Sequence, residues 1–232
     1  MHLLLTDRLA CPRCGPGFGL ILLADRIEDR RVLEGWLGCP NCRDRFPVRG
    51  GFGDLRPPPR DPFAGAPASF EAASREETVK LAALLGVAGG PGHLALLGDV
   101  ARHAGALADL LDEAEVVAVD PRVRGGEERP GVSRLATGPA LPFYSRSLRG
   151  VALDGAEGAD RLAEALRVTG PAGRVVVLGA GREVRRLLEE GGFAVALDES
   201  RVVVGLRRPG PEASPGGGVA LPVFPGPAGR NP

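Results

Sequence analysis

The chain has 232 residues and a formal charge of zero at neutral pH, which allows one ordinary domain with a small second one. This charge balance gives no general attraction to nucleic acids or membranes. The only early apolar run, Leu3–Leu5, is too short for a secretory signal, and no run approaches the roughly 20 residues of a membrane span. We therefore expect a cytoplasmic protein, outside any membrane, whose cysteines stay reduced.

All four cysteines lie near the start of the chain, in the pairs Cys11-Pro-Arg-Cys14 and Cys39-Pro-Asn-Cys42. Two such pairs predict a zinc ribbon, because each tight turn directs two thiolates at one point and two turns complete a tetrahedron. Four thiolates leave no open position, so the zinc would be structural and would supply about 10 kcal/mol of folding free energy. Two disulfides conflict with a reducing compartment, and a thioredoxin-like redox pair needs one such pair in a βαβ unit.

The residues around these cysteines also resemble a known family. The run LLLTDRLACPRC, the return CPNC and the segment Arg45–Gly51 are similar to the small zinc-ribbon activator subunit of tRNA, ribosomal RNA and protein methyltransferases. The resemblance covers about residues 2–55. It implies a ribbon without catalysis of its own that binds a methyltransferase along a strand edge. The segment Gly51–Asp54 departs from the family, which has a further apolar strand there.

Composition divides the chain into four parts. Residues 1–55 are the predicted zinc ribbon, in which Leu20–Leu23 and Val32–Leu37 are expected to form a hairpin. Residues 56–68 contain a Pro-rich run typical of a stiff linker, and residues 69–207 form the body. Residues 208–232 are rich in Pro and Gly, so we expect a disordered tail, interrupted by the apolar segment Val219–Phe224.

The body alternates predicted strands and helices. Ser74 and Glu77 predict a capping box that opens a helix through Val79, Ala82 and Leu85 and ends at Gly86. The expected strands are 94–97, 116–119, 132–135, 150–153, 175–177, 193–197 and 201–206, with a turn at 170–173. This order predicts an α/β fold: a Rossmann-like, mostly parallel seven-stranded sheet with a C-terminal antiparallel hairpin, preceded by the small zinc-ribbon β module.

The order of these elements over about residues 70–207 resembles a class I methyltransferase, which uses S-adenosylmethionine. The resemblance implies that Gly98 begins the cofactor loop, that Asp120 binds the ribose hydroxyls and that Thr137 lies beside the adenine. Asp99 is the remaining candidate for a cofactor contact. Val100 and Arg102 replace the next two loop glycines, and we expect their side chains to crowd the cofactor. Asp120 is equally well explained as a loop aspartate before Pro121.

Three functions remain open. The first is a catalytically degenerate methyltransferase-fold protein that acts as a binding or scaffold subunit, with another protein or an RNA-modification component as its partner. The second is an active S-adenosylmethionine-dependent methyltransferase whose ribbon acts in cis. The third is nucleic-acid binding by the ribbon arginines, although acids lie between them and aromatics are few. No residue is identified as catalytic, because no histidine has a neighbour that would complete a catalytic pair.

Overall fold

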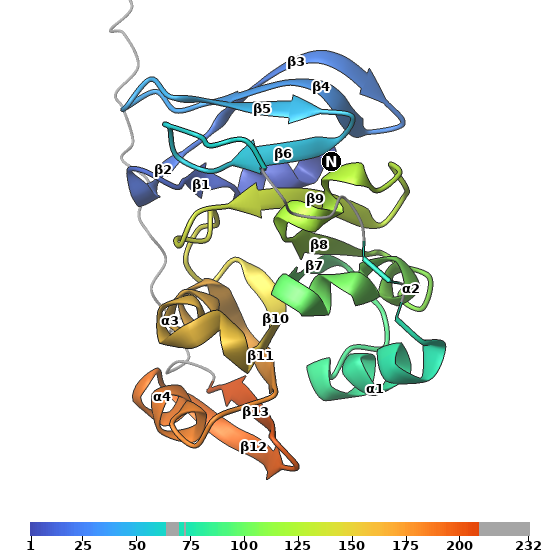
Figure 1. Cartoon of the computed structure of the whole chain (residues 1–232), viewed down its shortest axis with the longest axis vertical. Helices are drawn as coiled ribbons and strands as arrows, with labels where there is room; N and C mark the ends of the chain where they lie inside the picture. Colours follow the sequence, from blue (N-terminus) through green and yellow to red (C-terminus); the bar gives the residue numbers. More distant parts are fainter. Residues whose placement is uncertain (64–69, 72, 209–232) are drawn as a thin grey trace, which may run out of the picture.

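A computed structural model describes residues 1–63, 70–71 and 73–208. These residues form an α/β fold around one large mixed sheet (Figure 1). Part of the expected linker and nearly all of the expected tail, with the segment Val219–Phe224, lie outside the described residues. Two helices cover each face of the sheet: α1 (Arg75–Leu85) and α2 (Ala104–Ala108) on one, α3 (Gly158–Val168) and α4 (Val184–Glu190) on the other.

The strands fall into two sheets. A small one pairs β1 (Ala10–Cys11) with β2 (Gly15–Gly19). In spatial order, the large sheet contains β12 (Phe193–Glu199), β13 (Val202–Arg207), β11 (Thr169–Leu178), β10 (Leu148–Asp154), β7 (Gly92–Leu97), β8 (Ala114–Val119), β9 (Val132–Thr137), β6 (Phe52–Leu55), β5 (Arg45–Arg49), β4 (Arg31–Gly38) and β3 (Ile21–Glu28).

The central strands have a Rossmann order. Numbered along the body, β9, β8, β7, β10 and β11 stand in the spatial order 3-2-1-4-5, and neighbouring strands run parallel. β13 is antiparallel to both of its neighbours, which places the hairpin of β12 and β13 at the far edge. The chain reverses its direction of winding between β7 and β10, and the carboxyl ends of strands at such a point commonly bind ligands.

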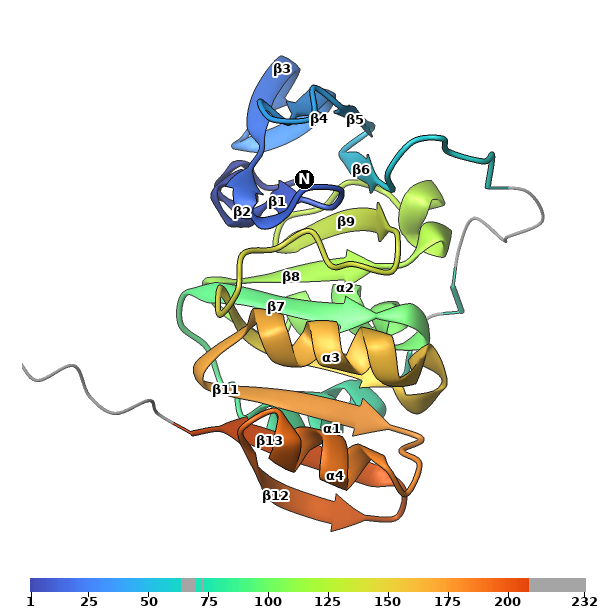
Figure 2. The same cartoon turned by 90° about the vertical axis from the view of Figure 1, so that its left-hand side faces the viewer.

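The ribbon is not a separate module in front of a seven-stranded sheet, as the sequence led us to expect. β3 to β6 extend the body's sheet to eleven strands, because β6 pairs in parallel with β9 from Phe52↔Arg134 to Leu55↔Thr137. Figure 2 shows the ribbon strands stacked on the β9 edge. An unpaired edge would leave a row of backbone N–H and C=O groups open to another chain, and β6 closes it.

The segment Gly51–Asp54, which seemed unlike an interface strand, contains most of this contact strand. Its pattern misleads because Gly53 must be bare: a Cβ there would lie 2.9 Å from Leu135 Cδ2. The side chains of Leu135 and Leu55 pack against this position, and a larger residue there would collide with them. Leu55, which follows, is fully buried in a core that continues from the ribbon into the body.

Charged groups are also buried where ribbon and body meet. Arg31 of β4, 7% exposed, lies 2.9 Å from Glu115 Oε1 and 2.6 Å from Glu128 Oε1. The Met1 amine donates to the same Glu128 oxygen at 2.8 Å, and Ser133 Oγ donates to Glu115 at 2.7 Å. These four acidic and basic groups come from both parts of the chain, so Arg31 and the Met1 amine meet these carboxylates only when the parts are docked, whereas Glu128 also pairs with Arg134 within the body.

Helix α1 begins and ends where the sequence predicts. Ser74 and Glu77 form the reciprocal capping box, and Gly86 ends the helix with a φ of 67°. The buried face differs from the expected one, however: Thr78, Leu81 and Leu85 face the core, whereas Val79 is 48% exposed. The way α1 packs on the sheet, and not the hydrophobicity of its residues alone, determines which face of the helix is buried.

The expected turn at 170–173 is wrong. These residues belong to β11, which begins at Thr169, and the pairing of β10 with β11 shifts register between Leu148 and Gly150. The irregularity admits Pro171 and Ala172, whose φ is 56°, at one end of an otherwise regular parallel strand. The segment therefore starts the strand instead of preceding it.

Within the described ranges, no helix combines the length and the apolar composition needed to cross a bilayer.

The buried Arg31–Glu115 pair should stabilise the docked arrangement. We expect Glu115→Gln to lower the free energy of unfolding by about 3 kcal/mol, since it leaves a buried guanidinium with one carboxylate fewer. Urea denaturation measures the loss. Glu76→Gln is the control: its carboxylate pairs with Lys80 at an exposed site, so the expected loss is below about 0.5 kcal/mol. Equal losses in the two variants would contradict this assignment.

The same interface should make the free energy of unfolding depend on pH in the acidic range. Burial by itself would raise the pKa of Glu128, but the Met1 amine and Arg31 outweigh it and hold this pKa below the ordinary 4.5. A carboxyl with a lowered folded-state pKa stabilises the fold above its unfolded pKa and loses that contribution as the pH falls. Unfolding free energies measured below about pH 4.5 should therefore fall more steeply for the native chain than for Glu128→Gln. Parallel curves would contradict this role.

Candidate functional site

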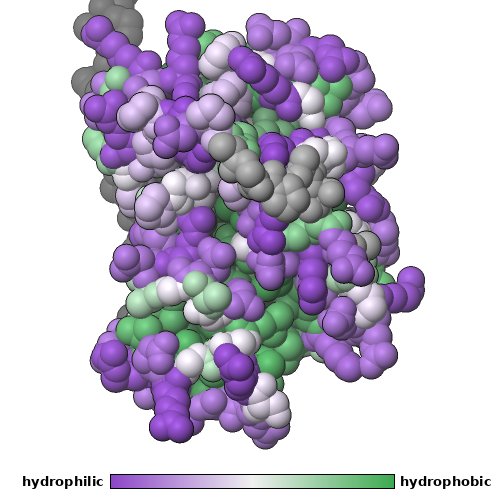
Figure 3. Space-filling model, viewed as in Figure 1, coloured by the Kyte–Doolittle hydropathy of each residue, from purple (hydrophilic) through white to green (hydrophobic). Residues whose placement is uncertain are grey.

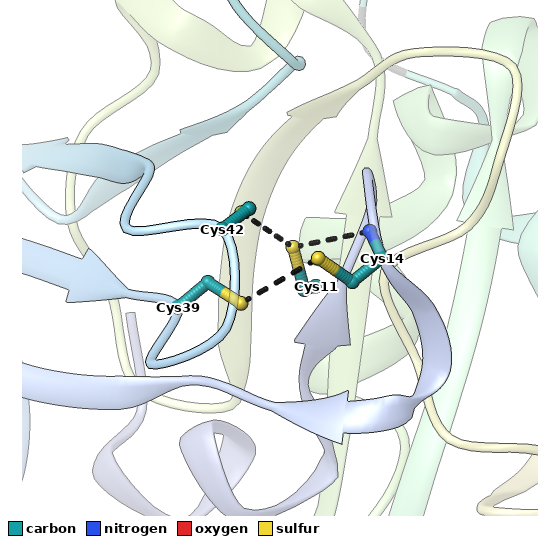
Figure 4. Close-up of side chains that lie close together, drawn as sticks. All are labelled: Cys11, Cys14, Cys39 and Cys42. Carbon is teal, nitrogen blue, oxygen red and sulfur yellow. Dashed lines mark hydrogen bonds between the residues drawn. The ribbon is translucent and has the colours of Figure 1, made fainter.

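The four cysteines converge at one end of the ribbon. Cys11 ends β1 and Cys14 lies in the turn before β2, while Cys39 and Cys42 lie in the turn between β4 and β5. Their sulfur atoms all lie within 4.8 Å of one another, and Figure 4 shows the side chains pointing toward one another. The predicted set of metal ligands is therefore brought together by two hairpin ends.

The sulfur geometry suits a metal ion rather than disulfides. All four thiols are free, and the Sγ atoms are 3.7 Å apart in Cys11 and Cys42 and 3.9 Å apart in Cys14 and Cys39. A tetrahedral ion with metal–sulfur bonds of about 2.3 Å would place its ligands ~3.8 Å apart. The four residues are thus positioned to bind a metal ion.

Hydrogen bonds support thiolates at this centre. The Cys14 amide donates to Cys11 Sγ at 3.4 Å, and Asn41 Nδ2 donates to Cys14 Sγ at 3.3 Å. Burial disfavours the Cys39 thiolate, but hydrogen bonds from the amides of Cys42 and Asn41 outweigh it and lower the pKa of Cys39 to about 7. Burial raises the pKa of Cys11 and of Cys42, because a thiolate loses its hydration when it is removed from water.

The second candidate site is the edge at which the parallel strands end. Gly98 follows β7, Asp120 follows β8, Thr137 ends β9 and Asp154 ends β10. Figure 3 looks onto this edge and shows hydrophobic residues gathered low on the face, over β10 and β11. The topology thus places the predicted cofactor residues Gly98, Asp120 and Thr137 on one edge, where Asp120 has a partner within the chain.

Arg122 links two of the predicted residues. It donates to both oxygens of Asp120, through Nε at 2.8 Å and Nη2 at 2.9 Å, and its Nη1 lies 2.6 Å from Asp99 Oδ1. Asp120 Oδ1 also accepts the Arg122 amide at 2.7 Å and so caps the short 3₁₀ helix Pro121–Gly125. The hydrogen bonds to Asp120 are the largest cause of the raised pKa of Arg122, so the guanidinium stays charged.

The other predicted residues are separated from this cluster. Gly98 has a φ of 62°, and the space in which its Cβ would lie contains the carboxylate of Glu157, from the turn after β10. The hydroxyl of Thr137 is buried without a hydrogen-bond partner among the described residues, and Thr137 pairs with Leu55 of the ribbon. Asp154, a further carboxylate on this edge that was not among the predicted residues, accepts the Ala156 amide at 2.8 Å.

The side chains that lie against Asp120 and Gly98 are not those of Val100 and Arg102. Val100 is 3% exposed and packs in the core, and Arg102 is exposed beside the following helix. The groups that reach Asp120 and Gly98 are instead Arg122 and Glu157. No sequence pattern marks them, since an arginine two residues after an aspartate is common in a chain with this composition.

No protein-family model matches the chain, and no curated protein matches its sequence. Three solved structures illustrate what the fold is similar to. A chain from the complex between the Haloferax volcanii Trm112 methyltransferase activator and the putative methyltransferase is 16% identical, with a TM-score of 0.45 over 58% of this chain and 90% of that one.

The other two are described as putative methyltransferases. The protein from Bacillus halodurans is 18% identical, with a TM-score of 0.41 over 53% of this chain and 70% of that one. The S-adenosyl-L-methionine-dependent one from Methanococcus maripaludis is 12% identical, with a TM-score of 0.45 over 60% of this chain and 86% of that one. Likeness at this level does not show what this chain binds or catalyses. Its own strand order and helix layers define a Rossmann-like α/β fold, with four cysteines positioned to bind a metal ion.

The cysteine cluster predicts a bound metal ion. Elemental mass spectrometry of the native full chain should find about one metal ion per chain, and Cys42→Ser should lose it, because three thiolates bind far more weakly than four. Asn41→Ala is the matched control: it removes the N–H···S bond to Cys14 but no ligand, and should keep the metal. A native chain without metal would contradict the assignment.

Proposed function

We propose that this chain is a methyltransferase-fold protein with a fused structural zinc ribbon, that its cofactor edge does not accept S-adenosylmethionine, and that it acts as a binding or scaffold subunit. The observation that carries the proposal is Arg122, which is held between Asp99 and Asp120. The partner of this chain would be another protein or an RNA-modification component, since the ribbon resembles the activator of enzymes that modify such substrates.

Asp120 stands where a ribose-binding carboxylate belongs in this fold, directly after the second strand of the parallel sheet. Ribose hydroxyls would have to displace a two-pronged, charge-assisted contact with Arg122, which is among the stronger hydrogen-bonded pairs in proteins. A neutral sugar offers weaker hydrogen bonds in return. The arrangement therefore favours the internal ion pair over the cofactor.

The carboxylate of Glu157 lies over Gly98, the other predicted cofactor position on this edge. A glycine after the first strand normally lets a ligand approach the backbone, and here the space over Gly98 holds a carboxylate. The carboxylate group of a bound methionine moiety would meet that negative charge. Since both ends of the cofactor would meet side chains of this chain, the residues present do not fit S-adenosylmethionine.

Zinc is the metal that best suits the cysteine centre. Four thiolates in tetrahedral spacing are typical of structural zinc sites, which keep no position open for a substrate or water. The centre ties the turn between β1 and β2 to the turn between β4 and β5, in the part of the chain that carries the β6 contact strand. Its role would be to hold the ribbon in the shape that docks on β9.

The alternative is an active S-adenosylmethionine-dependent methyltransferase whose ribbon acts in cis. Two observations favour it. Asp120 keeps the ribose-binding position, and β6 pairs with the β9 edge, as expected for a ribbon that resembles the activator family, whose members bind a methyltransferase along a strand edge. Methyl transfer needs few acids or bases, because placement of donor and acceptor supplies most of the rate. The two proposals therefore differ in one measurable property, namely cofactor binding.

Calorimetric titration of the metal-loaded full chain with S-adenosylmethionine and its demethylated product distinguishes them. We expect no binding at ligand concentrations up to ~1 mM and no shift in melting temperature. Micromolar binding that Asp120→Ala abolishes would sink the first proposal and support the enzyme. Asp154→Ala serves as a control, because this carboxylate ends β10 and caps a turn instead of facing Arg122.

A further inference from the structure

The crossover from β8 to β9 lacks a helix that would cover the sheet. Parallel strands are usually joined by a helix packed on the sheet face, but the residues between Val119 and Val132 form only the 3₁₀ helix Pro121–Gly125 and a loop. A cavity of about 590 Å³ lies between this crossover and the Ala101–Ala104 segment. Its volume falls within the range of small-molecule sites.

The floor and the rim of this cavity differ in chemistry. Small apolar side chains form the floor: Ala101, Ala104, Ala118 and Val132. Charged side chains line the rim: Arg102, Arg122, Arg129 and Arg134, with Glu127 and Glu128. An apolar floor beside an arginine without a carboxylate partner suits an anion that carries an apolar or aromatic body.

The rim arginines are not equally available. Arg134 is bound to Glu128 and to backbone carbonyls, and Arg129 pairs with Asp109. Arg102 is exposed and makes no hydrogen bond or ion pair within the described part of the chain. Arg122 is paired with both Asp99 and Asp120, and Glu127 and Glu128 also line the cavity, so Arg102 is the guanidinium there without a carboxylate partner among the described residues. Arg102 is the guanidinium best placed to receive an anion.

Phe70 adds an aromatic group to the lining. Its ring lies 4.2 Å from the guanidinium carbon of Arg122, so the two planar groups form one wall. Arginine forks bind phosphate with matched geometry, and aromatic or guanidinium planes stack on nucleobases. The combination favours a phosphorylated nucleoside over an aliphatic acid, which would use the floor but not the planar wall.

We propose that this cavity binds a 5′-phosphorylated nucleoside, with its base over the alanine floor and its phosphate at Arg102. The ligand is a free nucleotide or the 5′ end of an RNA, which offer the same chemistry. The site is separate from the cofactor edge: Gly98, Asp99, Asp120 and Thr137 do not line it, and Arg122 stands between the two. It is therefore independent of whether S-adenosylmethionine binds.

Adenosine monophosphate is the probe, titrated into the metal-loaded full chain by calorimetry. We expect submillimolar affinity, at least tenfold weaker binding of unphosphorylated adenosine, and at least tenfold loss in Arg102→Ala. Arg182→Ala, an exposed arginine outside the cavity, should leave the affinity unchanged. No binding, or equal loss in both arginine variants, would overturn the proposal.

Two further arms locate the ligand and identify its source. Ala104→Leu should weaken binding by filling the floor, and Thr137→Val should not, because Thr137 lies on the cofactor edge. The reverse result would overturn the proposal, and melting temperatures check that both variants fold.

A 5′-phosphorylated tetranucleotide that binds more tightly than both its 5′-hydroxyl form and the mononucleotide identifies RNA as the source. Tighter binding of the mononucleotide identifies a free nucleotide. S-adenosylhomocysteine binding that Asp120→Ala abolishes and Arg102→Ala leaves unchanged would overturn the proposed function while leaving this site intact.

Discussion

The pairing of β6 with β9 is the contact on which the rest of the structure depends. It joins a ribbon with little core of its own to a parallel sheet with an open edge, and one hydrophobic core then runs through both. Buried Arg31 and Glu115 and the partly buried Glu128 accompany the strand pairing, so a shifted register would leave charges unpaired in the interior. Because the two partners are on one chain, docking is intramolecular, and the β9 edge is not open to a second ribbon.

Arginine has a structural role throughout the body. Arg149 donates to the carbonyls of Gly89 and Gly90, Arg161 to those of Gly138 and Pro139, and Arg167 to those of Leu141 and Phe143. A guanidinium carries five donors in a fixed fork and can therefore satisfy several loop carbonyls at once. The same property lets Arg122 occupy Asp99 and Asp120 together. Arginine side chains thus hold the loops around the strand ends.

Much of the fold was predictable from local patterns. The cysteine spacing predicted a four-thiolate cluster, the capping box predicted the start of α1, and the alternation of apolar runs located all the strands of the body. For the candidate cofactor edge, the sequence predicted which backbone positions meet there but not which side chains reach them. Val100 and Arg102 were wrongly expected to crowd it, because sequence spacing does not show that one points into the core and the other outward.

The sequence by itself determined the features that depend on neighbours within a few residues: turns that present thiolates, helix caps, and strands with apolar faces. Tertiary structure alone decided three contacts: Gly53 leaves room for the side chains between the ribbon strand and β9, Arg122 donates to Asp120, and Glu157 lies over Gly98. These contacts join backbone edges and long side chains whose positions are set by the packing of distant elements. Their energies depend on burial and on paired charge, which no stretch of sequence shows before the chain is folded.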